Sequence, residues 1–370
     1  MTPKRPDGAG AIPVAVDTPA PIHTDSVPLY AALDLGTNSC RMLIARPKGA
    51  QFEVVDSFSK SVQLGSGLEA SGRLSRGSIA RTVQAMRICQ KKLRRHKVTR
   101  MRLIATEACR RATNAHELIS RVKRETGLKL EIIPAQEEAR LAVISCAPLM
   151  SRKTEQLLVV DIGGGSTELV WLDVSHLPKR DRKAAIMQVK HGFDGKKLPD
   201  TMARVVDWIS VPLGVATLRD QFMDVDNDAA RFALMSWFFE EKLANFTPYI
   251  GDHIRAGFQI IGTSGTVTTV AASHLNLRRY DRNKVDGLQM TSDQIDAVIQ
   301  EYLSLGPDGR RNDPRIGKDR QALIMSGAAI LQALLRIWPT DKLSVADRGL
   351  REGLLYALMS ADGVLIDEAD

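Results

Sequence analysis

Two aspartates in the sequence stand where a phosphate or metal ligand would be expected. Asp34 and Asp161 each lie at the end of an apolar run and directly before a glycine turn, in LDLGTNS and VDIGGGSTE. Two such carboxylates facing a bound phosphate would repel each other unless a cation lay between them. Mg²⁺ prefers carboxylate, water and phosphate oxygens. The sequence therefore predicts a site for Mg²⁺, or another divalent cation, at Asp34 and Asp161.

Three loops of the chain are suited to phosphate binding. Glycine has no Cβ, so backbone N–H groups near it can approach an anion closely. The third loop also lies where a strand leads into a helix, and a helix N-terminus carries partial positive charge. One such loop alone is usually a tight turn, but three together indicate a phosphate-binding cleft. The candidate residues are Gly36, Thr37, Asn38 and Ser39, then Gly163, Gly164, Gly165 and Ser166, and finally Thr263, Ser264, Gly265 and Thr266.

Two adjacent acids, Glu137 and Glu138, follow an apolar run in IIPAQEEARL. Acidic residues are common at helix starts because they interact favourably with the helix dipole. Neighbouring residues on a helix point about 100 degrees apart, so only one of the two can face a cleft.

The elements that must position these residues follow a repeated pattern. Apolar runs LYAALDLG, RMLIAR and QFEVVDSF predict three strands in a meander. Helical spacing predicts a helix over 78–95. Next come a strand near 101–105, a helix near 114–125, a strand at 129–132 and a helix from 136.

The pattern restarts at Gln156 with EQLLVVDIGGGSTELVWL. Aligning Asp34 with Asp161 also superposes Gly36 on Gly163 and Ser39 on Ser166, which indicates two copies of one unit. Residues 178–197 read as an inserted loop before a third strand at 205–213. Helices near 215–222 and 228–245, a strand at 257–261 and a mainly helical last third complete the chain. The prediction is an α/β protein of two similar domains.

Composition limits the class of protein. A chain of 370 residues exceeds one ordinary hydrophobic core. The net charge of +8 indicates a polyanionic partner or simply a solvated basic surface. The four cysteines show no CxxC spacing, and no segment has the apolar length of a membrane helix or secretory signal, which favours a cytoplasmic protein without a membrane partner. The proline-rich residues 1–28 are predicted to form a flexible tail.

Seven segments, in order, resemble the exopolyphosphatase and guanosine pentaphosphate phosphohydrolase (Ppx/GppA) family from about Leu29 to Met359. They are ALDLGTNSCRMLIA, ATEACRRATN, IIPAQEEARL, VVDIGGGSTELV, ISVPLGVATL, IIGTSGT and SVADRGLREGLLYAL. The resemblance implies two ribonuclease H-like domains with a cleft between them, as in actin, sugar kinases and the heat shock 70 chaperones. Their expected limits are 29–135 and 136–346, with a helix at about 347–362 packing back on the first.

The family's functional residues map onto this chain. By resemblance, Glu138 is the general base that activates the attacking water. Asp161 and Glu168 match acids around the metal and the water, with Asp34 in the facing loop. Arg110 matches an arginine that contributes charge to bound phosphate. Larger members continue into a C-terminal helical domain of the HD phosphohydrolase type, whereas this chain is expected to stop near the end of the second domain, which leaves processivity and a homodimer open.

The predicted function is exopolyphosphatase activity, the release of terminal orthophosphate from inorganic polyphosphate. An alternative keeps the site but takes guanosine pentaphosphate (pppGpp) as substrate. A kinase or ATPase would need an adenosine pocket that no motif provides, and a non-catalytic alarmone-nucleotide-binding protein would not need the acids. No nucleic acid partner is expected. Basic residues proposed to guide a long polyanion are Arg94, Arg95, Lys97, Lys196, Lys197, Arg310, Arg311 and Arg315.

Overall fold

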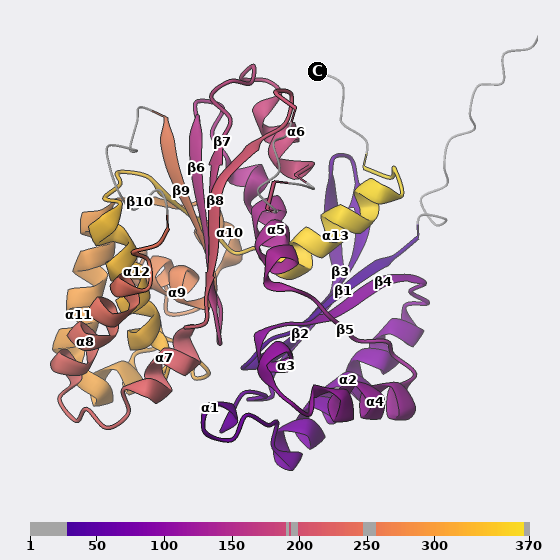
Figure 1. Ribbon diagram of the computed structural model, residues 1–370, viewed down its shortest axis with the longest axis horizontal. Helices are drawn as coiled ribbons and strands as arrows, with labels where there is room; N and C mark the ends of the chain where they lie inside the picture. The colour runs from indigo at the N-terminus through magenta and orange to yellow at the C-terminus, as the bar shows by residue number, and fades with distance from the viewer. Residues whose placement is uncertain (1–27, 190–191, 194–198, 247–256, 366–370) are drawn as a thin grey trace, which may run out of the picture.

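The computed structural model describes residues 28–189, 192–193, 199–246 and 257–365, which form two halves, each built on a mixed sheet (Figure 1). The tail predicted over 1–28 lies outside the described residues, apart from its last residue. No helix in the described ranges combines the length and apolar character needed to cross a membrane.

The first sheet has the strand order β3-β2-β1-β4-β5, with β1 antiparallel to β2 and parallel to β4. Helices α2 and α4 cover one face, where Ile79, Val83 and Met86 of α2 join the buried cluster (Figure 1). Its strands are β1 (Tyr30–Leu35), β2 (Ser39–Lys48), β3 (Gln51–Ser61), β4 (Arg100–Ala105) and β5 (Glu131–Ile132). Its helices are α1 (Leu68–Ser71), α2 (Arg76–Arg95), α3 (Glu107–Arg111) and α4 (Ala115–Thr126).

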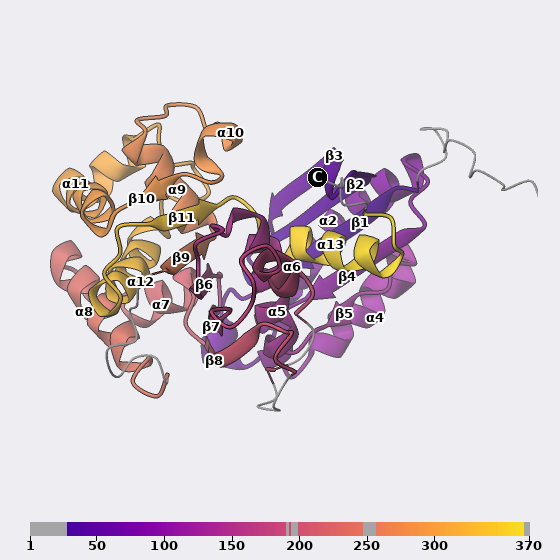
Figure 2. The same cartoon turned by 90° about the horizontal axis from the view of Figure 1, so that it is seen from above.

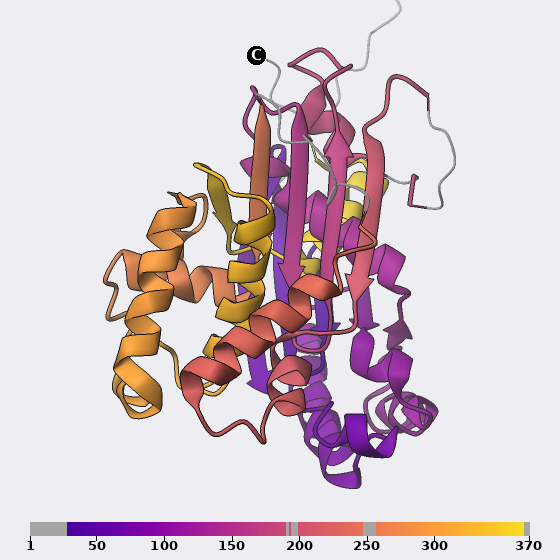
Figure 3. The same ribbon diagram turned by 60° about the vertical axis from the view of Figure 1, so that its left-hand side comes forward.

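The second sheet has the order β10-β11-β9-β6-β7-β8, and Figure 3 shows β9, β6, β7 and β8 side by side. Its strands are β6 (Gln156–Ile162), β7 (Thr167–Asp173), β8 (Arg204–Val211), β9 (Phe258–Thr263), β10 (Gln289–Met290) and β11 (Leu343–Ala346). Its helices are α6 (Arg182–Met187), α7 (Val215–Gln221), α8 (Asp228–Glu241), α9 (Gly265–His274), α10 (Arg282–Val285), α11 (Ser292–Asn312) and α12 (Ile324–Ile337). The sequence predicted neither β10 nor β11.

The two sheets repeat one arrangement. In both, a first strand is antiparallel to the second and parallel to the fourth, β1 with β2 and β4, and β6 with β7 and β9. The turns repeat too, because the Gly36 amide donates to the Ser39 carbonyl at 3.0 Å and the Gly163 amide to the Ser166 carbonyl at 2.9 Å. The predicted duplication of one unit is therefore confirmed.

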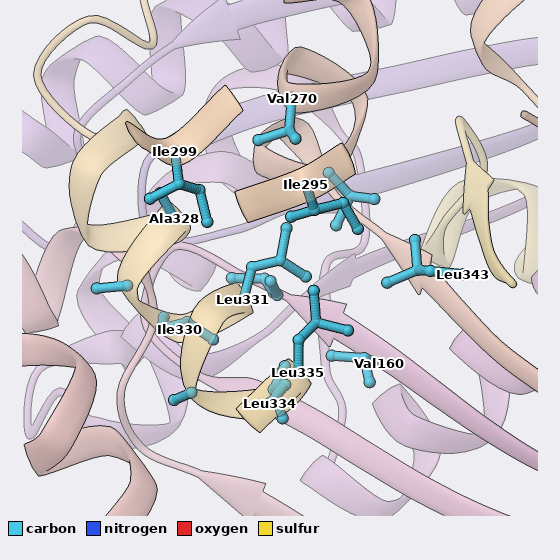
Figure 4. Packing of buried hydrophobic residues seen from close by; sticks show 14 of the residues in the cluster. Val160, Val270, Ile295, Ile299, Ala328, Ile330, Leu331, Leu334, Leu335 and Leu343 are labelled. Atoms are coloured by element: carbon cyan, nitrogen blue, oxygen red, sulfur yellow. The ribbon is translucent and has the colours of Figure 1, made fainter. Parts of the chain in front are cut away.

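The core of the second half fixes the strands that carry its loops. Figure 4 shows Leu331 and Leu335 of α12 packed with Val160 of β6 and Leu343 of β11. Burial of such aliphatic side chains stabilises the folded state by about 1.5–3 kcal/mol each. The ends of β6 and β9 are thereby held in register beside the cleft.

Two helices lie side by side between the sheets, α5 (Ala135–Cys146), followed by η2 (Ala147–Leu149), and α13 (Leu350–Ala361) (Figures 1 and 2). Helix α5 buries Ala139 and Val143 against the second sheet, while its Leu141 packs in a cluster with α13 and β1. The division of the chain at residues 135 and 136 stays a prediction.

The inserted segment is more ordered than a loop in its described part. It contains α6, and Ile186, Val189 and Phe193 are buried in the cluster that includes α5. Arg182 is also buried and donates to the carbonyls of Leu177 and Thr154. The prediction of a plain loop over 178–197 was wrong because its apolar residues, although widely spaced, supply a packing face. Lys196 and Lys197 lie outside the described residues.

Candidate functional site

The three predicted phosphate loops meet at one cavity of about 310 Å³ between the two halves. The loop after β1, the loop after β6 and the loop between β9 and α9 all line it. The sites come together because β1 and β6 occupy equivalent places in the two sheets. The predicted residues on the wall are Asp34, Gly36, Thr37, Asn38, Ser39, Glu138, Asp161, Gly163, Gly164, Gly165, Ser166, Thr263, Ser264, Gly265 and Thr266.

The glycines after β6 allow the two halves to touch. A Cβ on Gly165 would lie 2.4 Å from Thr37 Oγ1, and a Cβ on Gly164 would lie 3.5 Å from the Asn38 amide. Any larger residue at 165 would push the second loop away from the first. From the sequence, we expected these glycines to let an anion approach the backbone. The structure shows a second reason for glycine here, because a side chain would clash with the loop after β1.

Two backbone amides after the third loop's serine are hydrogen-bonded to that serine's side chain. The Ser264 hydroxyl accepts from the amides of Thr266 and Val267 at 3.1 and 3.3 Å, which caps α9. Ser264 has φ 145°, an unusual value for a residue other than glycine. Strained backbone of this kind is often found at functional sites.

Asp34 and Asp161 are enclosed at the cavity. Asp34 Oδ1 is buried without a hydrogen-bond partner among the described residues. Burial raises the pKa of Asp34, while the charges of Arg351 and Arg41 oppose the shift. Burial, followed by the charges of Glu138 and Asp34, raises the pKa of Asp161 to about 8. Carboxylates this costly to ionise, one with an orphaned oxygen, fit a divalent cation.

Glu168 does not join that pair in the described structure. It faces Asp161 across the β6–β7 ladder, but it is absent from the described residues that line the cavity, and its Oε1 accepts from Ser210 Oγ at 2.8 Å. Burial and the Asp161 charge raise the pKa of Glu168 to about 7. Within the described ranges, no three His, Cys, Asp or Glu side chains form a ready metal cluster. The predicted three-acid metal set is therefore not assembled, although Mg²⁺ commonly uses one or two carboxylates with water and phosphate oxygens.

The two acids at the start of α5 have different surroundings. Glu138 lines the cavity. Burial and then the charge of Glu168 raise the pKa of Glu138, and Arg110 opposes the shift. Glu137 instead pairs with Arg102 and Arg140, each at 2.7 Å. Only Glu138 is placed to act on a molecule in the cavity.

Arg110 is occupied by carboxylates rather than open to phosphate. Its Nη1 donates to Glu138 Oε2 at 2.6 Å and its Nη2 to Glu107 Oε2 at 2.7 Å. Arg110 is not among the described cavity-lining residues, whereas Glu107 is. The role in phosphate binding implied by the resemblance has no contact in this geometry to support it.

Sequence reasoning missed the arginines of the cavity. Arg41, Arg320 and Arg351 line it. Burial lowers the pKa of Arg41, and the nearby charges of Arg351 and Arg320 lower it further. Arg41 Nε is buried without a hydrogen-bond partner among the described residues. A fourth, Arg348, is neutralised by Asp286 at 2.8 Å. Arg41 and Arg351 stand in the segments GTNSCR and LREG, but nothing in the sequence showed that they meet Arg320.

The basic surface is less suited to guide a polyanion than the sequence suggested. Arg310 is buried against Asp228 at 2.8 Å, and Arg315 pairs with Glu301 and Asp313 at 2.5 and 2.6 Å. Arg94 is exposed near the C-terminal end of α2.

The fold and the site together define a two-domain α/β protein with glycine loops and paired aspartates at its central cleft. The sequence profile described as the Ppx/GppA phosphatase family matches residues 43–362, so the chain belongs to this family. The predicted family and fold are thereby confirmed.

Relatives of known name agree with this membership. The guanosine-5'-triphosphate,3'-diphosphate pyrophosphatases of Photobacterium profundum and Aeromonas salmonicida are each 27% identical to this chain. The match covers 90% of this chain and 60% of each relative, so the chain spans about 60% of their length.

Solved structures of similar length share the fold. The Aquifex aeolicus member of the Ppx/GppA family has a TM-score of 0.71 and 29% identity, covering 91% of this chain and 99% of its own. An exopolyphosphatase from Cytophaga hutchinsonii has a TM-score of 0.75 at 21% identity, covering 92% of this chain and all of its own. The second comparison bears on the fold alone.

Proposed function

We propose that this chain hydrolyses a terminal phosphoanhydride bond of a polyphosphorylated ligand. The observation that carries the proposal is the single cavity where Asp34, Asp161 and Glu138 face three arginines and three glycine or hydroxyl loops. Phosphoryl transfer to water depends mainly on positioning and charge neutralisation, which these groups supply. A non-catalytic binder would have no use for Glu138, because a carboxylate that holds no cation repels an anionic ligand.

Each group has a distinct part in the proposed reaction. Arg41, Arg320 and Arg351 bind the phosphate oxygens, and the binding relieves the repulsion among the three cations. Glu138 accepts a proton from the water that attacks the terminal phosphorus. Asp34 and Asp161 would hold a divalent cation, which supplies neutralisation of phosphate charge when it is bound.

Guanosine pentaphosphate is the proposed substrate. The exopolyphosphatase reading was preferred from the sequence, but the relatives matched over 90% of this chain are named for a guanosine nucleotide. The exopolyphosphatase of Cytophaga hutchinsonii shares only the fold at 21% identity. Inorganic polyphosphate offers the same terminal phosphate and is the competing substrate in the test.

The first prediction is that purified protein with Mg²⁺ releases orthophosphate from guanosine pentaphosphate with a higher kcat/KM than from long-chain polyphosphate. ATP serves as the control for a kinase-like or ATPase site. A higher kcat/KM on polyphosphate would reverse the substrate assignment. Failure to release phosphate from all three would leave a binding protein and refute hydrolysis.

The second prediction concerns the cation and is read from stability rather than activity. The ordinary pKa of Asp161 is 3.8, and its pKa in the folded protein is about 8. The protonated carboxyl therefore stabilises the folded state, and this stabilisation is lost as pH rises from 3.8 through about 8. A cation must displace that proton at pH 6 but not at pH 9. We expect Mg²⁺ to raise the Tm at both pH values, and more at pH 9 than at pH 6. At a Mg²⁺ concentration of 100 times Kd, the stabilisation by binding is about 2.7 kcal/mol.

Thermal unfolding followed by circular dichroism, with Mg²⁺ or with EDTA, measures this gain. Asp161→Asn should abolish most of it. Asp173→Asn, at the opposite end of the β6–β7 ladder, is the matched control and should keep it. An equal gain at both pH values, or an undiminished gain in Asp161→Asn, would remove Asp161 from the cation site.

A further inference from the structure

The loop after β4 places an acid at the edge of the anion cavity. Glu107 is the first residue of α3, as Gly265 is the first residue of α9 in the second half. Both line the cavity. A negative charge beside bound phosphate opposes binding, so Glu107 needs another explanation.

The contacts of Glu107 supply one. Its Oε2 accepts from Arg110 Nη2 at 2.7 Å and from Arg110 Nε at 3.1 Å. On its other side the same guanidinium donates through Nη1 to Glu138 Oε2 at 2.6 Å and to the Ile133 carbonyl at 3.1 Å. All three nitrogens of Arg110 are therefore engaged.

These three side chains form a partly enclosed chain of charges. Their side-chain exposures are 12% for Glu107, 17% for Arg110 and 8% for Glu138. Charge-assisted bonds to a planar guanidinium fix orientation as well as distance. Because α3 and α5 are separate elements, Arg110 is the link that sets the Glu138 carboxylate relative to the loop after β4.

We propose that Glu107 is a positioning residue, which holds Arg110 against Glu138 and keeps that guanidinium away from substrate phosphate. The inference rests on the proposed function, since it concerns the geometry of the proposed base. Without Glu107, two of the three guanidinium nitrogens lose their partner. The guanidinium can then rotate toward phosphate in the cavity, and Glu138 loses its fixed orientation.

The test is the kinetics of Glu107→Ala. Displacement of a reacting group by about 1 Å can cost on the order of 100-fold in rate. We therefore expect kcat for phosphate release from guanosine pentaphosphate to fall about 10- to 100-fold. KM should stay the same or fall, because the freed guanidinium can bind phosphate. Glu107→Gln keeps an acceptor oxygen and should lose less. Glu117→Ala is the matched control, because Glu117 pairs with Arg73 at 2.9 Å and is 46% exposed, and its kcat should equal that of the wild type.

A double-mutant comparison separates positioning from general damage. If Glu107 acts through Glu138, then Glu107→Ala causes no further loss in the Glu138→Gln background. An equal fold loss in both backgrounds would overturn the proposal. So would a rise in KM for Glu107→Ala with kcat unchanged, because that marks a contribution to substrate binding.

A crystal structure of Glu107→Ala provides a readout without activity. The proposal expects Arg110 to leave Glu138 and the Glu138 carboxylate to turn from its present direction. An unchanged Arg110 to Glu138 bond would overturn it. If the wild type released no phosphate, hydrolysis would be refuted, and this structure would still decide whether Glu107 positions Glu138.

Discussion

Glu138→Gln is expected to lower kcat for phosphate release by about 100- to 10,000-fold, the usual contribution of a positioned general base. Glutamine has nearly the same shape as glutamate and can still accept the hydrogen bond from Arg110 Nη1, so the fold and the cavity are preserved. It cannot take a proton from water. KM should therefore stay close to that of the wild type, because the loss falls on the transition state.

The same variant should remove a pH dependence. Burial and the Glu168 charge raise the pKa of Glu138, so the fraction of the base that is unprotonated increases as pH rises through that pKa. Wild-type kcat should increase with pH over that interval. The residual activity of Glu138→Gln should not show the same rise, and phosphate release measured across a pH series tests both statements.

Glu137→Gln is the matched control for this experiment. Glu137 is the neighbouring residue and carries the same charge, but it is held by Arg102 and Arg140. We expect a change in kcat of less than a few-fold. Turnover of Glu138→Gln at the wild-type rate, or equal losses in both variants, would show that Glu138 is not the base.

The cation and phosphate loops were predictable because their signal is local. An apolar strand, an acid and a glycine turn occur twice, and the repeat implies equivalent places in two similar sheets. Equivalent places bring Asp34 and Asp161 to one cavity, where both are found. Adjacency of Glu137 and Glu138 likewise implied that only one faces the cleft.

The partners of those residues could not be predicted because they come from distant segments. Arg41, Arg320 and Arg351 lie on β2, before α12 and on α13, so their meeting depends on how the two halves close. The engagement of Arg110 by Glu107 depends on side-chain directions in a helix of five residues. β11 was missed because four buried residues give too short an apolar run to stand out.

Gly353→Ala is expected to destabilise the protein by about 1–3 kcal/mol, the usual cost of overpacking a core. By helix propensity alone, alanine in the middle of α13 would stabilise it by about 1 kcal/mol. The packing reverses that sign. A Cβ at 353 would lie 2.2 Å from the carbonyl oxygen of Leu141 and 2.9 Å from its carbonyl carbon. These are backbone atoms of α5, so the clash can be relieved only by separating the two helices.

Separation of α5 from α13 would also displace Glu138 in the cavity, because Leu141 lies one helical turn from Glu138 on α5. We therefore expect Gly353→Ala to lower both the free energy of unfolding in urea and kcat. Gly317→Ala is the matched control, since a Cβ there meets nothing within 4 Å and its stability should change by less than about 0.5 kcal/mol. A more stable Gly353→Ala variant would mean that α5 and α13 do not cross as closely as described. In that case the position of Glu138 could no longer be attributed to the crossing, because the helix that carries it would have room to move.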